Sequence, residues 1–515
     1  MRNKFLQAAC MVVFLLCSCK KSFLEQTDPF SVTSTQFFTT EADILLALNG
    51  CYQAVRSNSA LGETSDLYTD QRSDDTGTND NQSNGGEPFQ FGNYSILPTN
   101  SYLEKHWVAM YQIQARCNAL LSNIDKIPFT DSLKPIVAGE ARFLRALTYF
   151  HLVRKWGDVP MSTVALTTPS EISSATCRVK AQVVYDQIIA DLTSAYGAGL
   201  PVRQPDANRG RASQQAVTYL LGQVYLTRYA TLDGGNAGTA TGTTDLDSAN
   251  YYLRACYKLK TFDSLSSIPY TDVFDVNKKA TCPELIWQIV YIQGDPNSNH
   301  SNIAASAQAA GEYINTRKKI SSGVGYNVTH DLVNEYEPGD PRGAFSIRYD
   351  NEATVKDWYI TKYRDTSSAA GPNGYGGNDW PIMRYADVIL MLAEVNMYKG
   401  NTTDAINYLN MVRARAGMPD YATSMNNAAY AAICPTLKLA ILHERRVELA
   451  FEHHRWFDLL RFFPINDLVA YMRAKPRVNF NLENIANFST KDEYFPIPYN
   501  ETILDPVKMY QNPGY

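Results

Sequence analysis

The 515-residue sequence lacks the short motifs that mark common catalytic and cofactor sites. It contains no G-x-S-x-G nucleophile elbow, no phosphate-binding loop and no dinucleotide fingerprint. His443 and Glu444 begin an H-E-x-x-H zinc motif, but Val447 stands where the second histidine is required. The nine cysteines form no Cys-x-x-Cys pair, which argues against a zinc or thioredoxin-like centre. We therefore predict no catalytic residue, no metal site and no cofactor. The two carboxylates of a glycosidase can lie far apart in sequence, so motif analysis alone leaves an enzyme open.

A surplus of positive charge is missing as well. Lys and Arg number 47 against 52 Asp and Glu, which gives a formal net charge of -5 at pH 7. Such a balance does not suit a polyanionic partner, so we predict that the protein does not bind nucleic acid. Tyrosine, in contrast, is abundant at 33 residues, which favours surfaces that grip an amphipathic partner.

The N-terminus is typical of a bacterial lipoprotein. The apolar run Phe5–Leu16 follows two cations and is too short to span a bilayer, so residues 1–18 are predicted to be a signal peptide. Leucine three residues before and serine one residue before Cys19 match a lipobox, in which cleavage exposes a cysteine that carries diacylglycerol. Ordinary cleavage nearby is the alternative. We predict a lipid on Cys19 and a polar tether over residues 19–35, because acyl chains contribute about 0.8 kcal/mol per buried methylene.

Helical periodicity covers two parts of the chain. The spacing of Ala393, Gly400, Ala405 and Leu409 is that of a tetratricopeptide repeat, whose small residues let two helices pack closely. We therefore predict a mainly all-α fold built on a tetratricopeptide-like helical-repeat scaffold. The predicted elements are a first helix at 41–57 and helix pairs at 105–154, 179–229, 214–259 and 384–416.

Two long segments lack this periodicity. Residues 260–379 are predicted to be an irregular, loop-rich insert with little strand, and Glu284–Gln293 is its one convincing strand. Residues 61–100 are polar and rich in glycine, with aromatic residues at both ends. Loops of this length inside a compact body are usually functional or mobile.

The stretch Leu437–Phe463 combines strong helix formers with dense charge and aromatic bulk, and we predict one long, partly buried helix that closes the repeat stack. Acidic and basic side chains recur along it at steps of three and four. Leaving one buried charge unpaired costs several kcal/mol, so we interpret these residues as a structural ion-pair network rather than as catalytic groups. Its predicted members are Glu444, Arg445, Glu448, Arg455 and Asp458.

These residues also carry a family resemblance. Glu444-Arg445, Glu448-Leu449, Phe451-Glu452, Arg455 and Asp458-Leu459-x-Arg461 resemble the ER..EL.FE..R..DL.R pattern of the SusD/RagB family. The last residues, FPIPYNETILDPVKMYQNPGY, resemble that family's C-terminal ending. The family's usual glycine after Phe-Glu is His453 here, a departure that concerns the local turn. The match continues upstream and implies a single SusD-like body over residues 36–515, with repeats at about 105–259 and 384–463.

The resemblance implies a function. A SusD-like protein is expected to be a non-enzymatic lipoprotein of the outer membrane that faces the cell exterior and captures a glycan. It is expected to deliver that glycan to a SusC-like TonB-dependent transporter, as part of polysaccharide utilization. A secreted glycan-cleaving enzyme and a repeat scaffold that binds only protein or peptide are the alternatives.

The two non-helical segments are the predicted ligand surface. The repeat helices pack on their neighbours, and in the resembled family the helical face meets the transporter. Aromatic rings offer flat faces to sugar C–H groups, while amide and carboxylate side chains on the same loops bond the hydroxyls. We nominate Tyr68, Phe89, Phe91, Tyr313, Tyr375 and Trp380 as ligand-binding residues.

Overall fold

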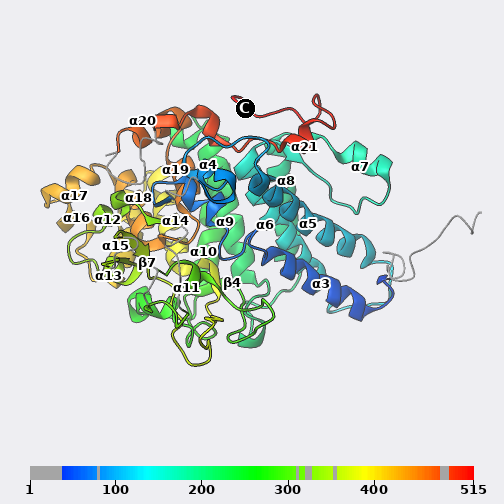
Figure 1. The fold of residues 1–515 in the computed structure, drawn as a ribbon, viewed down its shortest axis with the longest axis horizontal. Coiled ribbons are helices and arrows are strands. Elements are labelled where there is room, and N and C mark those ends of the chain that lie inside the picture. The colour runs from blue at the N-terminus through cyan, green and yellow to red at the C-terminus, as the bar shows by residue number, and fades with distance from the viewer. Residues whose placement is uncertain (1–36, 78–81, 309–312, 319–326, 352–355, 476–485) are drawn as a thin grey trace, which may run out of the picture.

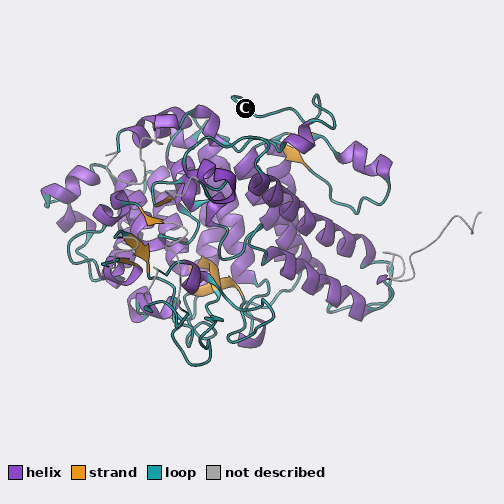
Figure 2. Cartoon of the chain, in the orientation of Figure 1, coloured by secondary structure: helices purple, strands orange, loops and turns teal. Residues whose placement is uncertain are grey.

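The computed structural model describes residues 37–77, 82–308, 313–318, 327–351, 356–475 and 486–515. The predicted signal peptide, Cys19 and the tether lie outside the described residues. Helices form most of the ordered structure and the strands are short, as Figure 1 and Figure 2 show. The prediction of a mainly all-α fold is confirmed.

The elements have the following bounds. The longer α-helices are α3 (Glu41–Val55), α5 (Ser101–Asn123), α6 (Lys134–Trp156), α8 (Ala181–Tyr196), α9 (Gln214–Thr231), α10 (Thr244–Lys258), α14 (Tyr385–Tyr398), α15 (Thr402–Arg415), α18 (Leu437–Leu449), α19 (Arg455–Phe462) and α20 (Ile465–Arg473). The shorter ones are α4 (Phe89–Gly92), α7 (Pro169–Ala175), α11 (Ile303–Ser306), α12 (His330–Glu335), α13 (Pro341–Ser346), α16 (Tyr421–Ser424), α17 (Ala428–Ile433) and α21 (Tyr499–Thr502). The strands are β1 (Thr76–Gly77), β2 (Val159–Pro160), β3 (Arg178–Val179), β4 (Leu285–Ile289), β5 (Asn327–Val328), β6 (Ile347–Tyr349), β7 (Trp358–Ile360) and β8 (Trp380–Arg384).

The helices of all four predicted pairs are present and pack in chain order. Helix α6 lies against α5 and α8, α9 against α8 and α10, and α14 against α15. Gly222 allows the close approach of α9 to α10, because a Cβ there would lie 2.5 Å from the side chain of Leu253. In Figure 1, α3, α5 and α8 lie on one side of the molecule, and α15 to α18 lie on the other.

Local sequence explains where the first helices begin and end. The Thr40 side chain accepts a hydrogen bond from the backbone N–H of Asp43, and the Asp43 carboxylate accepts one from the backbone N–H of Thr40. This capping box starts α3. At the end of α6, Gly157 adopts a φ of 71°, which glycine tolerates without a steric penalty.

The predicted single helix over Leu437–Phe463 is wrong: the stretch forms α18 and α19, which are joined by a tight turn. The first helix ends at Leu449, because Ala450 adopts an extended ψ of 134°. In the turn that follows, Phe451 and His453 adopt φ values of 63° and 65° in the left-handed region. A side chain costs about 1 kcal/mol or more in that conformation. Glycine, the residue that the resembled family has at the position of His453, avoids this cost.

The insert contains more strand pairing than its composition indicates. The predicted strand is present as β4, and it pairs antiparallel with β8, which directly follows the insert. Strands β6 and β7 form a second antiparallel pair, and β1 pairs with β5. Sequence patterns do not predict these pairs, because each strand is short and β8 contains a proline at position 381.

The first non-helical segment is less exposed than its polar sequence indicates. Its charged residues from Asp70 to Asp75 are buried, because arginines of the C-terminal helices pair with two of the acids. The helices share an apolar core that also includes β4 and β8, and a second cluster lies between α14, α15, α18 and α19. Cys117 and Cys256 are buried free thiols. Within the described residues, every helix is too short or too polar to cross a membrane.

Candidate functional site

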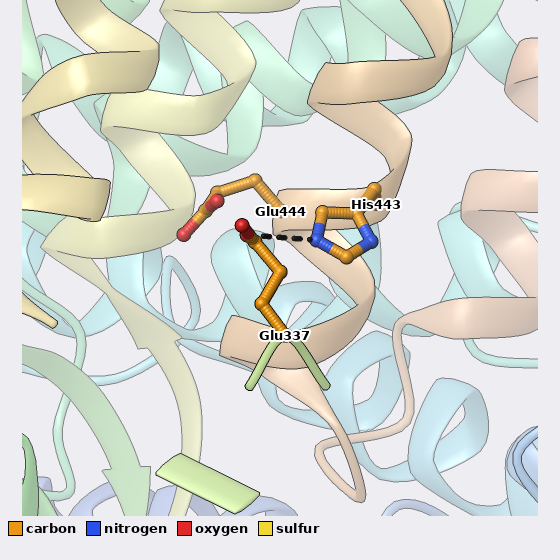
Figure 3. A group of neighbouring side chains, drawn as sticks. All are labelled: Glu337, His443 and Glu444. Carbon is orange, nitrogen blue, oxygen red and sulfur yellow. Dashed lines mark hydrogen bonds and ion pairs between the residues drawn. The ribbon is translucent and has the colours of Figure 1, made fainter. Parts of the chain in front are cut away.

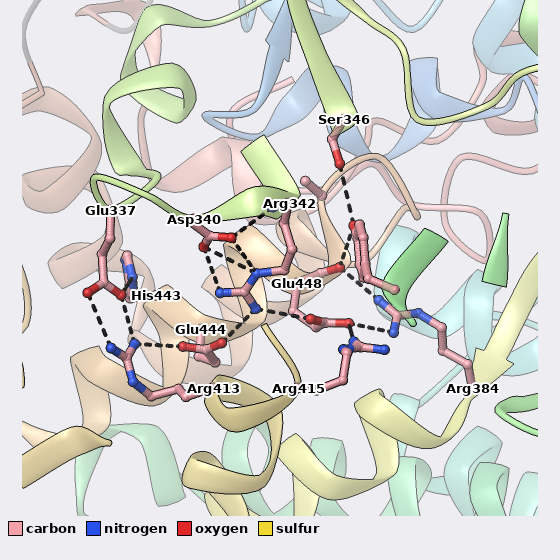
Figure 4. A network of polar contacts seen from close by, with 12 residues as sticks. Glu337, Asp340, Arg342, Ser346, Arg384, Arg413, Arg415, His443, Glu444 and Glu448 are labelled. Carbon is pink, nitrogen blue, oxygen red and sulfur yellow. Dashed lines mark hydrogen bonds and ion pairs between the residues drawn. The ribbon is translucent and has the colours of Figure 1, made fainter. Parts of the chain in front are cut away.

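A row of charged side chains on α18 lies in the protein interior, where Figure 4 shows it in contact with arginines from several elements. Glu444 accepts hydrogen bonds from Arg342 at 2.6 Å and from Arg413 at 2.9 Å. Glu448, one turn further along, lies 3.0 Å from Arg342 and 2.7 Å from Arg384, and it also pairs with Arg415. The network therefore joins α18 to α13, α15 and β8.

The basic residues of α18 extend the network in the other direction. Arg445 lies 2.6 Å from Asp387 of α14 and 2.9 Å from Asp458 of α19. Arg446 lies 2.8 Å from Asp75, in the N-terminal loop segment. The Arg455 guanidinium forms two hydrogen bonds to the Asp74 carboxylate, at 2.7 and 2.8 Å. The five residues predicted to form a structural network are thus all buried and paired with opposite charges.

The network holds its carboxylates in the ionised form. Burial alone would raise the pKa of Glu448, but the charges of three arginines outweigh burial and hold it well below its ordinary value. The pKa of Asp458 is lowered in the same way by Arg445 and Arg461, against the effect of burial. A general acid needs a pKa near the working pH, so these carboxylates are unsuited to proton transfer at neutral pH.

Glu337, His443 and Glu444 form the closest cluster of potential metal ligands among the described residues, and Figure 3 shows how they face one another. Their ligand atoms lie within 4.8 Å of one another. The Arg413 guanidinium already neutralises these carboxylates, because it lies 2.7 Å from Glu337 and 2.9 Å from Glu444. Burial disfavours charge on His443, yet the hydrogen bonds that its ring donates to the carboxylates of Glu335 and Glu337 raise its pKa to about 9. A protonated ring cannot bind a metal, so the cluster is an ion-pair site.

A second group of acids has raised pKa values but surrounds almost no space. Burial raises the pKa of Glu63 and of Asp66 to about 7, and it raises that of Asp70 well above its ordinary value. All three carboxyl groups line a cavity of about 10 Å³. That volume holds about one water molecule, so a sugar cannot reach these groups in this conformation.

Three of the six predicted ligand-binding aromatics lie inside the core. Tyr68 is 4% exposed and stacks on His106 at 3.9 Å, and Phe91 is fully buried against Tyr68. Trp380 is 1% exposed in β8, with its ring 4.5 Å from that of His453. No ring face of these residues is available to a ligand from solvent. Their neighbours in the sequence are typical of open loops, whereas packing against distant helices and strands covers them.

The other three predicted aromatics lie nearer the surface. Tyr313 is 52% exposed, whereas Phe89 in α4 and Tyr375 in the insert are partly buried. The ring of Tyr375 lies 4.3 Å from that of His300. The segments that carry Tyr313 and Tyr375 are adjacent, because a Cβ at Gly374 would lie 2.7 Å from Thr316.

The structure also contains a groove that sequence analysis missed. It has a volume of about 840 Å³ and lies between α3, α5 and the loop at residues 207–211. Arg56, Arg116 and Arg211 line it, on three separate elements. One sequence signal could have indicated this groove. Asn49 and Gln53 are exposed and lie four residues apart in α3, which indicates a polar helix face.

Comparison with known proteins places the chain in a family. A model of the SusD family matches residues 343–515, and a model described as "Starch-binding associating with outer membrane" matches residues 22–226. The SusD-like protein P2 of Formosa agariphila is 27% identical over 98% of both chains. A SusD-like protein of Bacteroides ovatus is 23% identical over 90% of this chain and 83% of its own length.

Solved structures share the fold over nearly the whole chain. A structure titled "Laminarin binding SusD-like protein" matches with a TM-score of 0.73 and 24% identity, covering 93% of this chain and 100% of the other. Surface glycan-binding protein A of Bacteroides thetaiotaomicron, in complex with laminarihexaose, matches with a TM-score of 0.72 and 21% identity over 92% and 100% of the two chains. The buried pairs of α18 involve the residues that carry the family's sequence pattern. The chain belongs to the SusD/RagB family.

Proposed function

We propose that the protein is a surface lipoprotein that binds a glycan and delivers it to a SusC-like TonB-dependent transporter in the outer membrane. The observation that carries this proposal is the family match, which includes a model described as starch-binding and associating with the outer membrane. Two proteins with the same fold are described as binding laminarin and as complexed with laminarihexaose, which supports a glycan as the ligand.

The surface loops of the insert offer a second line of support. Tyr313 exposes about half of its surface, and Tyr375 with His300 forms a ring pair on an adjacent segment. Sugar rings bind to such faces through their C–H groups, and each stacked ring contributes about 1 kcal/mol, by analogy with aromatic pairs. We retain Phe89, Tyr313 and Tyr375 as the proposed ligand-binding residues.

The lipid on Cys19 would hold the body at the membrane surface. More than one acyl chain on that cysteine makes a stable anchor, because two membrane signals bind far more tightly than one. The helical repeats are the proposed contact with the transporter, since repeat scaffolds commonly present an extended binding surface. Orientation toward the cell exterior follows from the same proposal.

Binding without catalysis agrees with the titration behaviour of the buried acids. The carboxylates of the α18 network are ionised, and those with raised pKa values surround a cavity of about 10 Å³. Neither group offers the pair of accessible carboxyls, about 5 to 10 Å apart, that glycosidases use.

An affinity experiment distinguishes a glycan-binding protein from a glycan-cleaving enzyme and from a scaffold that binds only protein. The purified protein is incubated with immobilised and soluble polysaccharides, including starch, laminarin and pectin, and new reducing ends are measured in parallel. We expect retention of the protein without new reducing ends. New reducing ends would identify an enzyme, and absence of retention on every polysaccharide would favour a scaffold that binds only protein.

A further inference from the structure

The groove between α3 and α5 has an unusual charge for this protein. The whole chain carries a formal net charge of -5, yet the described residues that line the groove include three arginines and no acid. A cleft lined by one sign of charge focuses the electrostatic field and concentrates ligands of the opposite sign. The volume of about 840 Å³ falls within the range of about 300 to 1,000 Å³ that is usual for ligand sites.

Among the described residues, two of the three guanidinium groups donate hydrogen bonds to neutral oxygens only. Arg56 donates to the side-chain oxygen of Asn299 at 2.5 Å, and Arg116 donates to the backbone oxygen of Gly50 at 2.6 Å. Arg211 is different, because it lies 3.0 Å from the Glu140 carboxylate. The groove therefore retains two positive charges without a carboxylate in salt-bridge contact.

Glu63 is a buried acid whose carboxyl group interacts electrostatically with Arg56. Burial raises the pKa of Glu63 to about 7, so at neutral pH this residue carries only part of a negative charge. Its carboxylate is also engaged by the side chain of Ser301 and the backbone of Asn302. Glu63 thus offsets the charge of Arg56 only in part.

The remaining lining suits a sugar. The rings of Phe37, Phe38 and Tyr52 offer apolar faces, and the amides of Asn49, Gln53 and Asn208 offer hydrogen bonds to hydroxyl groups. Asn49, Gln53 and Asn208 are exposed, so a ligand can reach them from solvent. The groove thus combines sugar-binding chemistry with cationic groups.

We propose that this groove binds an anionic oligosaccharide, one that bears carboxylate or sulfate groups. The proposal rests on the proposed glycan-binding function. It adds a groove that Phe89, Tyr313 and Tyr375 do not line, and it specifies an anionic substrate class. Arg56 and Arg116 bind the acidic groups through charge-assisted hydrogen bonds, for which the planar guanidinium fork is well suited. The aromatic rings and amides bind the neutral parts of the same chain.

The test uses the full-length protein and three probes: an oligogalacturonide for carboxylates, a sulfated carrageenan oligosaccharide for sulfates, and a neutral laminarin oligosaccharide. Arg56→Gln and Arg116→Gln are compared with Arg254→Gln, which removes the same charge from an exposed position on α10 outside the groove. We expect each groove variant to weaken binding of at least one anionic probe by about tenfold or more, and the control to leave it unchanged. Lysine at either groove position should restore part of the affinity, and added salt should weaken binding of the anionic probes.

Several results would overturn the proposal. Equal affinity for anionic and neutral probes would do so, as would anionic binding that both groove substitutions leave intact. If laminarin alone binds, and the variants bind it normally, the anionic groove is refuted while glycan binding stands. If no glycan binds the wild-type protein, the proposed function itself fails. If the substitutions change only protease cleavage of the segment before Phe37, the groove holds the protein's own N-terminal segment instead.

Discussion

Replacing Glu448 by Gln removes a buried carboxylate that three arginines share. The side chain keeps its size, but the charge opposite Arg342, Arg384 and Arg415 is lost. Each of the three guanidinium groups retains another acidic partner, Asp340 for the first and Glu284 for the other two. The substitution therefore leaves an excess of positive charge in the interior without emptying the site.

The size of the effect follows from this geometry. Breaking one buried ion pair costs about 3 to 5 kcal/mol, because the remaining charge has lost its compensation in a medium that solvates it poorly. The entropy of unfolding is about 2.1 cal/mol/K per residue, so a body of this length loses about 1 °C in Tm for each kcal/mol. We expect Tm to fall by about 3 to 5 °C.

Differential scanning calorimetry measures this shift directly. Asp404→Asn is the matched control, because it removes one negative charge from an exposed position on α15, and it should change Tm by less than about 1 °C. Glycan affinity of the folded Glu448 variant should equal that of the wild type. A Tm equal to the wild type, or normal stability combined with lost binding, would refute a structural role for the network.

Further predictions concern titration, ligand contact and anchoring. His443 has a pKa of about 9 in the folded protein against an ordinary value of 6.5. Its protonation therefore adds about 3 kcal/mol to the free energy of unfolding below pH 6.5, and this stabilisation is lost as pH rises through 9. Accordingly His443→Gln should flatten the fall of Tm over that interval, and an unchanged pH profile would contradict the assignment. Alanine at Tyr313 or Tyr375 should weaken glycan binding by about fivefold to tenfold without lowering Tm, and normal titrations of both variants would remove these rings from the site. Cys19→Ser should release the protein from the membrane fraction, so a variant that still sediments with membranes would refute lipid anchoring at this position.

The helical framework could be predicted from sequence because its signals are local. Steps of three and four between apolar residues define α5 and α6, and small residues at repeat spacing define α14 and α15. At the turn between α18 and α19, the local signals wrongly predict one continuous helix. Helix propensity continues through His453, and the left-handed conformation there depends on tertiary contacts, including the hydrogen bond from its backbone to Asp70.

The ligand surface was harder to predict, because exposure is a tertiary property. Trp380 lies among glycine, asparagine and aspartate in the sequence, which is typical of a loop, yet it belongs to a strand that pairs with β4. Tyr68 lies in a polar segment, two acids of which form buried ion pairs with Arg446 and Arg455. Arg56, Arg116 and Arg211 line the same groove although they are far apart in the sequence. Their spacing in the sequence therefore does not predict that they lie close together.

Titration of the full-length wild-type protein with defined oligosaccharides, followed by calorimetry, tests glycan capture most directly. The proposed function predicts a saturable isotherm for at least one oligosaccharide, and recovery of that oligosaccharide intact after the titration. The absence of binding heat for neutral, carboxylated and sulfated oligosaccharides alike, or recovery of shortened products, would contradict it.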